Sequence, residues 1–572
     1  MQILKCLSVL LVFICPLISK AQTTYLPEGS KENQFIDRLE IKQGNNTGIN
    51  FPGLKPYSRR SIVHEAEFID SFSLSYTNSL TESDHQNWKG LNLSSIDKYN
   101  LHSILMDNSE WVTGSRESFQ SKSPILKSFY ATKPNLVEVN TEDFFLAVNP
   151  VLVFEAGGEP AVGGSLSYSR RGITSRGRIA NKIGFSTTIT DNQERGPVFF
   201  QNRVNQFHAV PGVGFYKPFK KNGYDYFDAR GYVTFNVTKY IDFQFGYDKN
   251  FTGNGYRSLF LSDFGSSYLF LKINTKIWKF DYQNLFMELM PEFVKNGDKL
   301  LDRKYAAMHH LSLNATKWLN VGLFESVVFG RKNLFDFEYL NPIIFLRHIE
   351  GFVGSPDNAL AGADFKANVA HHFQFYGQLL LDEFILKHIT KNDGYWANKF
   401  GYQLGAKYVD AFNIHNLDLQ FETNHVRPFT YSHFDSVANY THYNQPLAHP
   451  LGANFQEFIG ILKYLPAPKW YINARALYYD QGLDLAGENF GSNPFELYTT
   501  RTKDYGYYNG DGDKIKVFNG SFVLSYELRE NLFIEGSLLY RKNSHTITLA
   551  PGNSTLFGIG IRWNAARREY DY

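Results

Sequence analysis

Two pairs of adjacent histidines are the strongest candidates for metal ligands in this sequence. They are His309–His310 and His371–His372. Chelation requires side chains that converge on one ion, whereas neighbouring residues of a β-strand point to opposite faces of the sheet. A pair on a strand therefore cannot easily hold one ion. The pattern favours histidines that lie in a lumen or at an interface, and we expect no metal site.

A second candidate for ion binding is the acidic, glycine-rich segment Asn509-Gly510-Asp511-Gly512-Asp513. Calcium prefers carboxylate ligands, but the segment lacks the spacing and the closing glutamate of an EF-hand loop. Asn-Gly and Asp-Gly are also the dipeptides that tight β-turns require. The segment is therefore interpreted as a turn.

Motifs of catalysis are missing from the sequence. It contains no Gly-x-Ser-x-Gly elbow, no phosphate-binding loop and no His-Glu-x-x-His pair. A hydrolase embedded in a barrel can still assemble a serine, a histidine and an acid from separate strands, so this alternative stays open. We expect a protein that is not an enzyme, has no catalytic residue and needs no cofactor.

Aromatic residues in polar loops best fit a binding role. Segments rich in glycine, aspartate and asparagine contain Tyr395, Trp396, Tyr505, Tyr507 and Tyr508. Flat rings can stack on sugar faces while neighbouring polar groups hydrogen-bond the hydroxyls. Membrane barrels also carry girdles of aromatic residues at their interfaces, and this alternative remains. These five residues are the candidate glycan contacts.

Two adjacent carboxylates, Asp382 and Glu383, end the apolar run Leu379-Leu380-Leu381. On a strand they would point to opposite faces. We expect the one that faces a lumen to pair with an arginine of the barrel.

The elements that would position these residues are strands, which the last fifty residues show most clearly. Three segments between Lys514 and Trp563 alternate strictly between apolar and polar or small residues. In the last of them Phe557, Ile559 and Ile561 are apolar, with glycine at the positions between. This period of two predicts a sheet with one apolar and one wet face. Tilted strands of roughly 9–11 residues are long enough to cross a bilayer.

The same alternation recurs from about Glu142 onwards. Short links such as 238–240 alternate with long polar ones such as 429–453, as in membrane barrels with short turns on one rim and long loops on the other. About 420 residues lie between Glu142 and Trp563, which allows about 18 strands at roughly 23 residues each. The fold class is therefore all-β, an antiparallel outer-membrane β-barrel. A soluble all-β protein would alternate as well.

Residues 1–21 resemble a secretory signal peptide. Lys5 precedes the apolar run Leu7 to Ile18, and Ser19 and Ala21 are the small residues before a cut at Gln22. Residues 22–141 are predicted to form a partly helical periplasmic region, in which Ser30 caps a helix that stops at Gly44. This region can be a soluble plug or an ordered arm. The barrel is assigned to residues 142–563, and residues 564–572 to a short tail.

Composition agrees with a membrane barrel. Aromatic residues make up 16% of the chain, although its mean hydropathy is negative, at -0.32. Both cysteines, Cys6 and Cys15, lie in the predicted signal, so we expect no disulfide in the exported protein. Without that segment, basic and acidic residues are equal in number, which argues against nucleic acid as a partner.

Several long segments are similar to a known family. They are Asn254 to Asp263, Glu338 to Arg347, Ser355 to Leu360 and Tyr376 to Phe384. These segments resemble the Wzi-like capsule-assembly proteins of the outer membrane. The opening segments Leu26 to Ser30 and Asp37 to Glu40 resemble the branch of this family in Bacteroidota, which includes the gliding-motility protein RemB.

The resemblance implies an 18-stranded barrel with a small helical element at its periplasmic end. It also implies non-catalytic binding of surface polysaccharide, in capsule attachment and assembly or in gliding motility. The motif arginines Arg257 and Arg347 are then expected to be lumen residues that hold the barrel together. Expected partners are outer-membrane lipids, surface or capsular polysaccharide, and cell-surface motility or adhesin proteins. An oligosaccharide diffusion channel remains an alternative.

Overall fold

The computed structural model describes residues 23–27, 29–45, 53–75, 93–125, 128–160, 164–180, 182–291, 300–332, 334–343, 345–546 and 553–572. The predicted signal segment lies outside these residues. Among the helices of the described ranges, none is long and apolar enough to cross a membrane.

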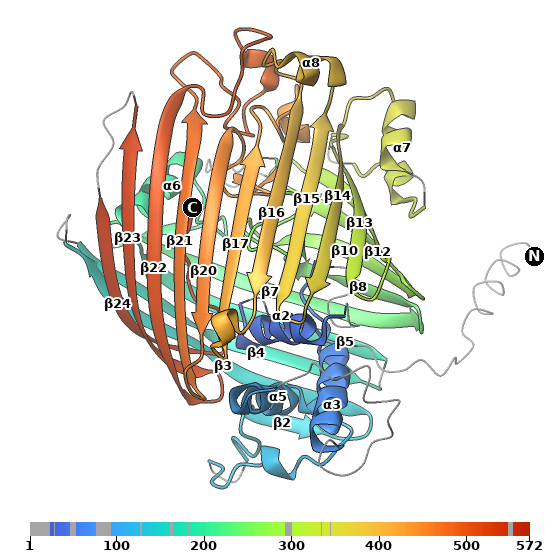
Figure 1. Ribbon diagram of the computed structural model, residues 1–572, viewed down its shortest axis with the longest axis vertical. Coiled ribbons are helices and arrows are strands. Elements are labelled where there is room, and N and C mark those ends of the chain that lie inside the picture. Colours follow the sequence, from blue (N-terminus) through green and yellow to red (C-terminus); the bar gives the residue numbers. More distant parts are fainter. Residues whose placement is uncertain are drawn as a thin grey trace, which may run out of the picture.

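Eighteen long strands close into one barrel in which all neighbouring strands are antiparallel (Figure 1). They are β3 (Phe144–Glu159), β4 (Gly164–Ile179), β5 (Ile183–Arg195), β7 (Gly223–Thr238), β8 (Ile241–Asp248), β10 (Tyr268–Ile277), β11 (Phe280–Leu289), β12 (Lys304–Asn314), β13 (Leu319–Phe329), β14 (Asn358–Val369), β15 (Phe373–Glu383), β16 (Lys399–Tyr408), β17 (Leu417–Val426), β20 (Phe455–Tyr464), β21 (Trp470–Leu483), β22 (Asp513–Arg529), β23 (Leu532–His545) and β24 (Ser554–Trp563). The last strand pairs with the first, Trp563 opposite Leu152, and closes the ring. The predicted fold class and the strand number of about 18 are confirmed.

Short strands and 3₁₀ turns complete the sheet and its loops. The short strands are β1 (Leu54–Lys55), β2 (Val137–Asn140), β6 (Lys217–Phe219), β9 (Phe251–Thr252), β18 (Thr441–His442) and β19 (Gln445–Pro446). The 3₁₀ turns are η1 (Ser109–Trp111), η2 (Glu117–Phe119), η4 (Phe337–Leu340), η5 (Ala411–Asn413), η6 (Ser436–Ala438) and η7 (Tyr498–Thr500). Strand β1 pairs with β9 and so ties the N-terminal region to an inner loop.

The alternation of side chains explains why the strands form a barrel. On β22, Phe518, Phe522 and Leu524 are exposed on the outer wall, whereas Asn519 and Ser525 are buried on the inner one. Successive residues of a strand point to opposite faces. An apolar outer face beside a polar inner face is the arrangement of a barrel that meets lipid outside.

The two rims of the barrel differ. At one rim short turns join the strands, and the helices α2 (Lys31–Gln43), α3 (Arg59–Ser75) and α5 (Ser95–Asp107) lie there (Figure 1). The opposite rim has the long loops, which contain α6 (Val198–Phe207), α7 (Leu346–Phe352) and α8 (Leu386–Lys391). In outer-membrane barrels the short turns face the periplasm and the long loops face outward.

Helix α2 lies in the mouth of the barrel at the short-turn rim. It follows Ser30 and ends at Gly44, whose φ of 67° is the left-handed conformation that favours glycine. Its Glu40 pairs with Lys366 of β14 at 2.7 Å, and both side chains are fully buried. Its Asp37 pairs with Lys407 of β16 at 2.8 Å. Charge pairs thus fasten α2 to the barrel wall.

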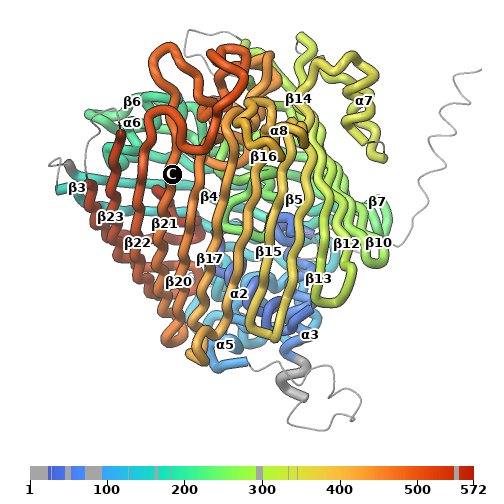
Figure 2. The backbone as a smooth tube through the Cα atoms, turned by 45° about the horizontal axis from the view of Figure 1, so that its top comes forward, coloured from blue at the N-terminus to red at the C-terminus, as the bar shows by residue number. Residues whose placement is uncertain are grey.

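Residues 564–572, which the sequence predicts only as a short tail, turn back into the barrel. The end of the chain lies within the ring of strands in both views (Figure 1, Figure 2). Arg567 contacts Glu535 of β23 at 2.7 Å, and Arg568 contacts Glu194 of β5 at 3.0 Å. These carboxylates belong to the inner wall, because the residues beside them on each strand face outward. We call residues 564–572 the inner tail.

Candidate functional site

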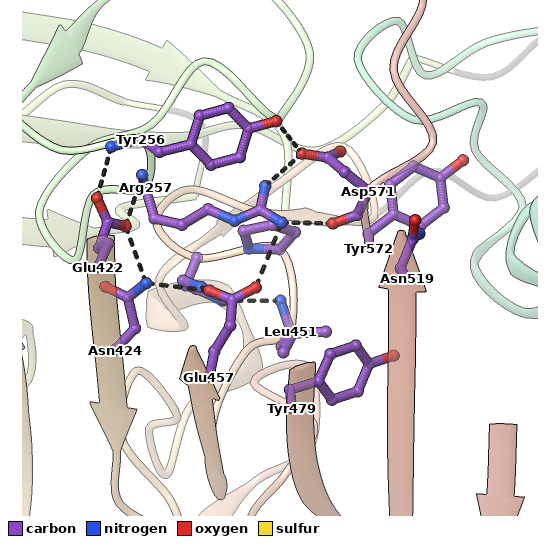
Figure 3. A network of polar contacts seen from close by, with 12 residues as sticks. Tyr256, Arg257, Glu422, Asn424, Leu451, Glu457, Tyr479, Asn519, Asp571 and Tyr572 are labelled. Carbon is purple, nitrogen blue, oxygen red and sulfur yellow. Dashed lines mark hydrogen bonds and ion pairs between the residues drawn. The ribbon is translucent and has the colours of Figure 1, made fainter. Parts of the chain in front are cut away.

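The interior of the barrel contains a polar network around Arg257 (Figure 3). Arg257 lies in loop 249–267, between β8 and β10, and its side chain is buried. Its guanidinium contacts Asp571 of the inner tail at 3.1 Å and Glu457 of β20 at 3.4 Å. The backbone N–H groups of Tyr256 and Arg257 donate to Glu422 of β17 at 2.6 and 3.0 Å. The structure therefore places Arg257 in the lumen.

This network spans the lumen from one wall to the other. On one side Gln378 of β15 accepts a hydrogen bond from the backbone N–H of Leu259 at 2.8 Å. On the opposite side of the ring Arg568 of the inner tail contacts Glu194 of β5 at 3.0 Å. Loop 249–267 and the inner tail, joined through Arg257 and Asp571, thus form a polar strut across the barrel.

The structure corrects the prediction for Arg347. This residue lies on α7, in the loop between β13 and β14, and its side chain is 70% exposed and pairs with Glu350 at 2.8 Å. It is not a lumen residue. Arg257 and Arg347 both lie in polar loops. They differ because the loop of Arg257 folds into the lumen and the loop of Arg347 folds outward.

The prediction for Asp382 and Glu383 is also corrected. Both carboxylates contact Lys399 of β16, at 3.0 and 2.9 Å, so their partner is a lysine and not an arginine. The β15–β16 register shifts between Leu381 and Glu383. A bulge of this kind re-aims a side chain, which is why two adjacent carboxylates reach one cation.

The five candidate glycan contacts lie together in two long loops at the outward rim, but with different exposure. Trp396 and Tyr507 are buried in a cluster with Phe429. The Arg501 guanidinium lies 3.8 Å from the centre of the Trp396 ring. These two rings form the core of the loop structure, so their prediction as glycan contacts is wrong.

Tyr505 and Tyr508 are about half exposed, at 50% and 42%. Tyr395, which is partly buried, stacks on His388 with the ring centres 4.2 Å apart and lies 5.4 Å from Tyr505. We call these four side chains the aromatic rim. They present ring faces and edges beside polar groups.

Backbone contacts hold the two loops of the aromatic rim together. Gly506 N–H donates to the carbonyl of Asp393, and Tyr507 N–H donates to that of Gly394, each at 2.9 Å. A Cβ on Gly394 would lie 2.8 Å from the Cα of Gly506, so this approach requires glycine. The rings are therefore positioned by a rigid contact between the loops.

Ionisable side chains that were not predicted as site residues lie in the aromatic rim or next to it. His388 pairs with Asp393 at 2.7 Å, and Arg501 pairs with Asp504 at 2.8 Å. Carboxylate, imidazole and guanidinium groups beside exposed rings can bind a polyhydroxylated ligand. Their proximity to Tyr395 and Tyr505 in the sequence is the one signal that could have revealed them.

The histidine pairs and the glycine-rich turn 509–513 make hydrogen bonds and ion pairs within the protein. His310 faces the lumen and pairs with Asp364 at 2.7 Å, and His371 contacts the carbonyl of Lys42 at 2.9 Å. In the turn, Asp511 accepts from the N–H of Tyr508 at 2.8 Å. Within the described ranges no three metal-ligating side chains form a group.

Loop 427–454, between β17 and β20, is held in place by a buried histidine. Met290 N–H donates to Nδ1 of His442, whose Nε2 donates to the carbonyl of Ser267, each at 3.0 Å. This arrangement requires the neutral imidazole, because a proton on Nδ1 would face the N–H of Met290. Burial lowers the pKa of His442 to about 4.

Acid should therefore loosen this loop. Between pH 6.5 and about 4 the unfolded chain takes up a proton at His442 that the folded chain does not. As the pH is lowered through this window, the free energy of unfolding decreases by up to about 3 kcal/mol. We expect the free energy of unfolding to fall less in His442→Asn than in the unchanged protein, measured by urea titration in detergent at pH 7 and pH 4.5. Equal losses would contradict this role of His442.

The comparisons with known proteins differ in what they find. No family model and no curated protein matches the chain. Among solved structures the chain is similar to Wzi of Escherichia coli, an outer-membrane protein involved in group 1 capsule assembly and described as a carbohydrate-binding β-barrel. The TM-score is 0.53 at 13% identity, over 93% of this chain and 98% of that one. This likeness shows an outer-membrane β-barrel fold.

Two further solved structures match with lower TM-scores. OprD of Pseudomonas aeruginosa has a TM-score of 0.40 at 9% identity, over 73% of this chain and 94% of that one. OccAB2 of Acinetobacter baumannii has a TM-score of 0.40 at 12% identity, over 73% and 98%.

Proposed function

We propose that this protein is an outer-membrane barrel that binds surface polysaccharide without catalysis. The observation that carries the proposal is the aromatic rim, in which exposed Tyr505 and Tyr508 lie beside Tyr395 and charged side chains at the outward end of the barrel. Similar rings on polar loops can stack on sugar faces. The fold shared with Wzi, a carbohydrate-binding barrel, supports this function.

The polar strut argues for a binding protein over a diffusion channel. It places ionic contacts between Arg257, Glu457 and Asp571 across the lumen. A cavity of about 70 Å³ borders the inner tail, which is room for roughly two water molecules. Steady conductance in planar bilayers would instead support the channel.

Removing the exposed rings should weaken polysaccharide binding. Aromatic contacts contribute about 0.5–1.5 kcal/mol each, so we expect Tyr505→Ala with Tyr508→Ala to reduce affinity roughly tenfold. Affinity electrophoresis with polysaccharide released from the expressing cells measures this change. Phe412→Ala is the matched control, because Phe412 is an exposed ring at the opposite rim.

An unchanged affinity in the double variant would contradict the rim as the binding site. The effect should be larger on a long polymer than on a short oligosaccharide, because several weak contacts on one chain act together. Comparison of both ligands with the same variants therefore separates loss of stacking from loss of folding.

The cellular role proposed for this binding is capsule attachment and assembly or gliding motility, in a bacterium of the Bacteroidota. The test is a strain without the gene, in which cell-bound and released polysaccharide and surface spreading are scored together. Polymer that is shed while cells still spread supports attachment. Bound polymer with lost spreading supports motility, with a motility or adhesin protein as partner.

A further inference from the structure

The loop between β13 and β14 folds outward and covers the outer wall of the barrel. We call residues 330–357, with η4 and α7, the flap; the structure describes all of them except 333 and 344. Both views show α7 outside the ring of strands (Figure 1, Figure 2). Buried flap residues Tyr339, Leu346 and Ile349 pack in one cluster with Val327 and Phe329 of β13.

The wall beneath the flap is the face that normally meets lipid. Leu323 of β13 is 59% exposed, and Leu311 of β12 is also exposed on the outer wall. Alternate residues of a strand share a face, so Glu325, Val327 and Phe329 face outward with Leu323. The flap is therefore continuous with the lipid-facing surface of the barrel.

Three polar side chains interrupt this outer wall under the flap. Asn284 of β11 is opposite His309 of β12, which is opposite Glu325 of β13. Nδ1 of His309 contacts Glu325 at 2.8 Å, and His309 is buried although it points outward. Polar groups of this kind are costly in hydrocarbon, and the flap shields them.

The same polar row satisfies the backbone of the flap. Asn284 donates to the carbonyl of Pro342 at 3.2 Å, and Glu325 accepts from the N–H of Leu346 at 2.9 Å. Pro342 has no N–H, and the N–H of Ile343 donates to the side chain of Asn341 at 3.1 Å. Irregular backbone within a bilayer needs such partners, because no water is there to supply them.

The exposed surface of the flap is largely apolar, although it also includes Arg347, which is 70% exposed. Five large side chains there are 69% to 84% exposed: Leu334, Phe337, Ile343, Phe345 and Phe352. Large exposed apolar patches mark interaction sites. Glu325, which accepts the hydrogen bond from Leu346, lies four residues before the end of β13. In a tilted strand this corresponds to a depth of about 10 Å below the end of the strand. This depth places the apolar side at the outer leaflet.

We propose that the flap is inserted into the outer leaflet of the membrane, with Ile343, Phe345 and Phe352 in contact with lipid acyl chains. The polar row holds the flap at this depth. The barrel thus binds lipid through a loop as well as through its strands, and its wall is widened on one side at the level of the outer leaflet.

Depth-dependent fluorescence quenching tests this proposal. Cys6 and Cys15 are replaced by serine, and a bimane label is attached to Ile343→Cys in the full chain, in phosphatidylcholine vesicles with a spin label on the acyl chain. Leu323→Cys on the lipid face and Tyr505→Cys on the aromatic rim are the matched controls. We expect quenching at position 343 within twofold of that at 323 and at least fivefold above that at 505.

Quenching at position 343 as weak as at 505 would overturn the proposal. Weak quenching together with disulfide crosslinking between two Ile343→Cys chains would overturn it in favour of a second copy on this face. Phe352→Cys is a second reporter with the same expectation, in case the first variant fails to fold. Folding is checked by the mobility shift of the barrel on unheated gels.

Discussion

A chain that ends at Trp563 should unfold at a markedly lower temperature than the full sequence. The inner tail supplies the partners of buried charges on the wall and on loop 249–267. Its loss leaves Arg257 without Asp571, Arg475 without Glu569 and Glu194 without Arg568. Removing one partner of a buried pair costs about 3–5 kcal/mol. We expect a total loss of several kcal/mol even where water enters the space.

Unfolding is followed by the fraction of heat-shifted barrel on gels as temperature rises. Asp571→Asn should be intermediate, because the amide can still accept a hydrogen bond but carries no charge. Tyr572→Phe is the matched control. Its hydroxyl finds no hydrogen-bond partner in the described part of the chain, so its removal should change little. A truncated chain as stable as the full one would contradict the strut.

Replacing Arg38 by alanine should release the N-terminal helices from the barrel mouth. Arg38 lies on α2 and contacts Asp97 of α5 at 2.7 Å. It also contacts Asp410 in the turn that follows β16 and Asp418 on β17. The variant leaves three neighbouring carboxylates with fewer cations. A cost of about 3–5 kcal/mol corresponds to roughly a hundredfold or greater rise in the population of the undocked state.

Limited proteolysis of the folded protein measures this undocking, because residues 23–125 become accessible while the barrel stays intact. Lys98→Ala is the matched control, since Lys98 is an exposed residue next to Asp97 on α5. Cleavage of Arg38→Ala at the rate of the unchanged protein would show that packing alone holds the helices.

Acid should destabilise loop 427–454 at a higher pH than it weakens the contacts of Arg38 at the short-turn rim. Burial opposes ionisation of Asp410, but Arg38 outweighs burial and lowers the pKa of this carboxyl to about 2. A carboxyl whose pKa is lower in the folded protein than in the unfolded chain stabilises the fold at any pH above its pKa in the unfolded chain. This stabilisation is lost only as the pH falls toward its pKa in the folded protein. Contacts of Arg38 should therefore persist at pH 4.5, where the unfolded chain already binds a proton at His442 that the folded chain does not.

The barrel could be predicted from sequence because its strands carry one strong signal. An apolar outer face and a polar inner face impose a period of two, and this period is visible in Phe557, Ile559 and Ile561. The helix from Lys31 to Gln43 was predictable from local signals as well, since Ser30 and Gly44 mark its ends. Both signals depend on residues that are close in the chain.

The sites were less predictable because they depend on contacts between distant loops. Trp396 and Tyr505 look alike as aromatic residues in polar loops, yet packing against Phe429 buries the first and leaves the second exposed. His309 and His310 face opposite sides of the wall, and only the flap explains why the outward one is buried. Alternation identifies the face of a residue but not what covers it.

The inner tail also has a consequence for the order of assembly. Its contacts reach residues 94 positions upstream for Arg475 and 376 positions upstream for Glu194. Contacts so distant in sequence form late in folding, and these require β5, β21 and the pairing of β24 with β3 to be in place. Docking of the inner tail therefore indicates that the ring of strands is complete, because the tail can make these contacts only after all the strands have paired.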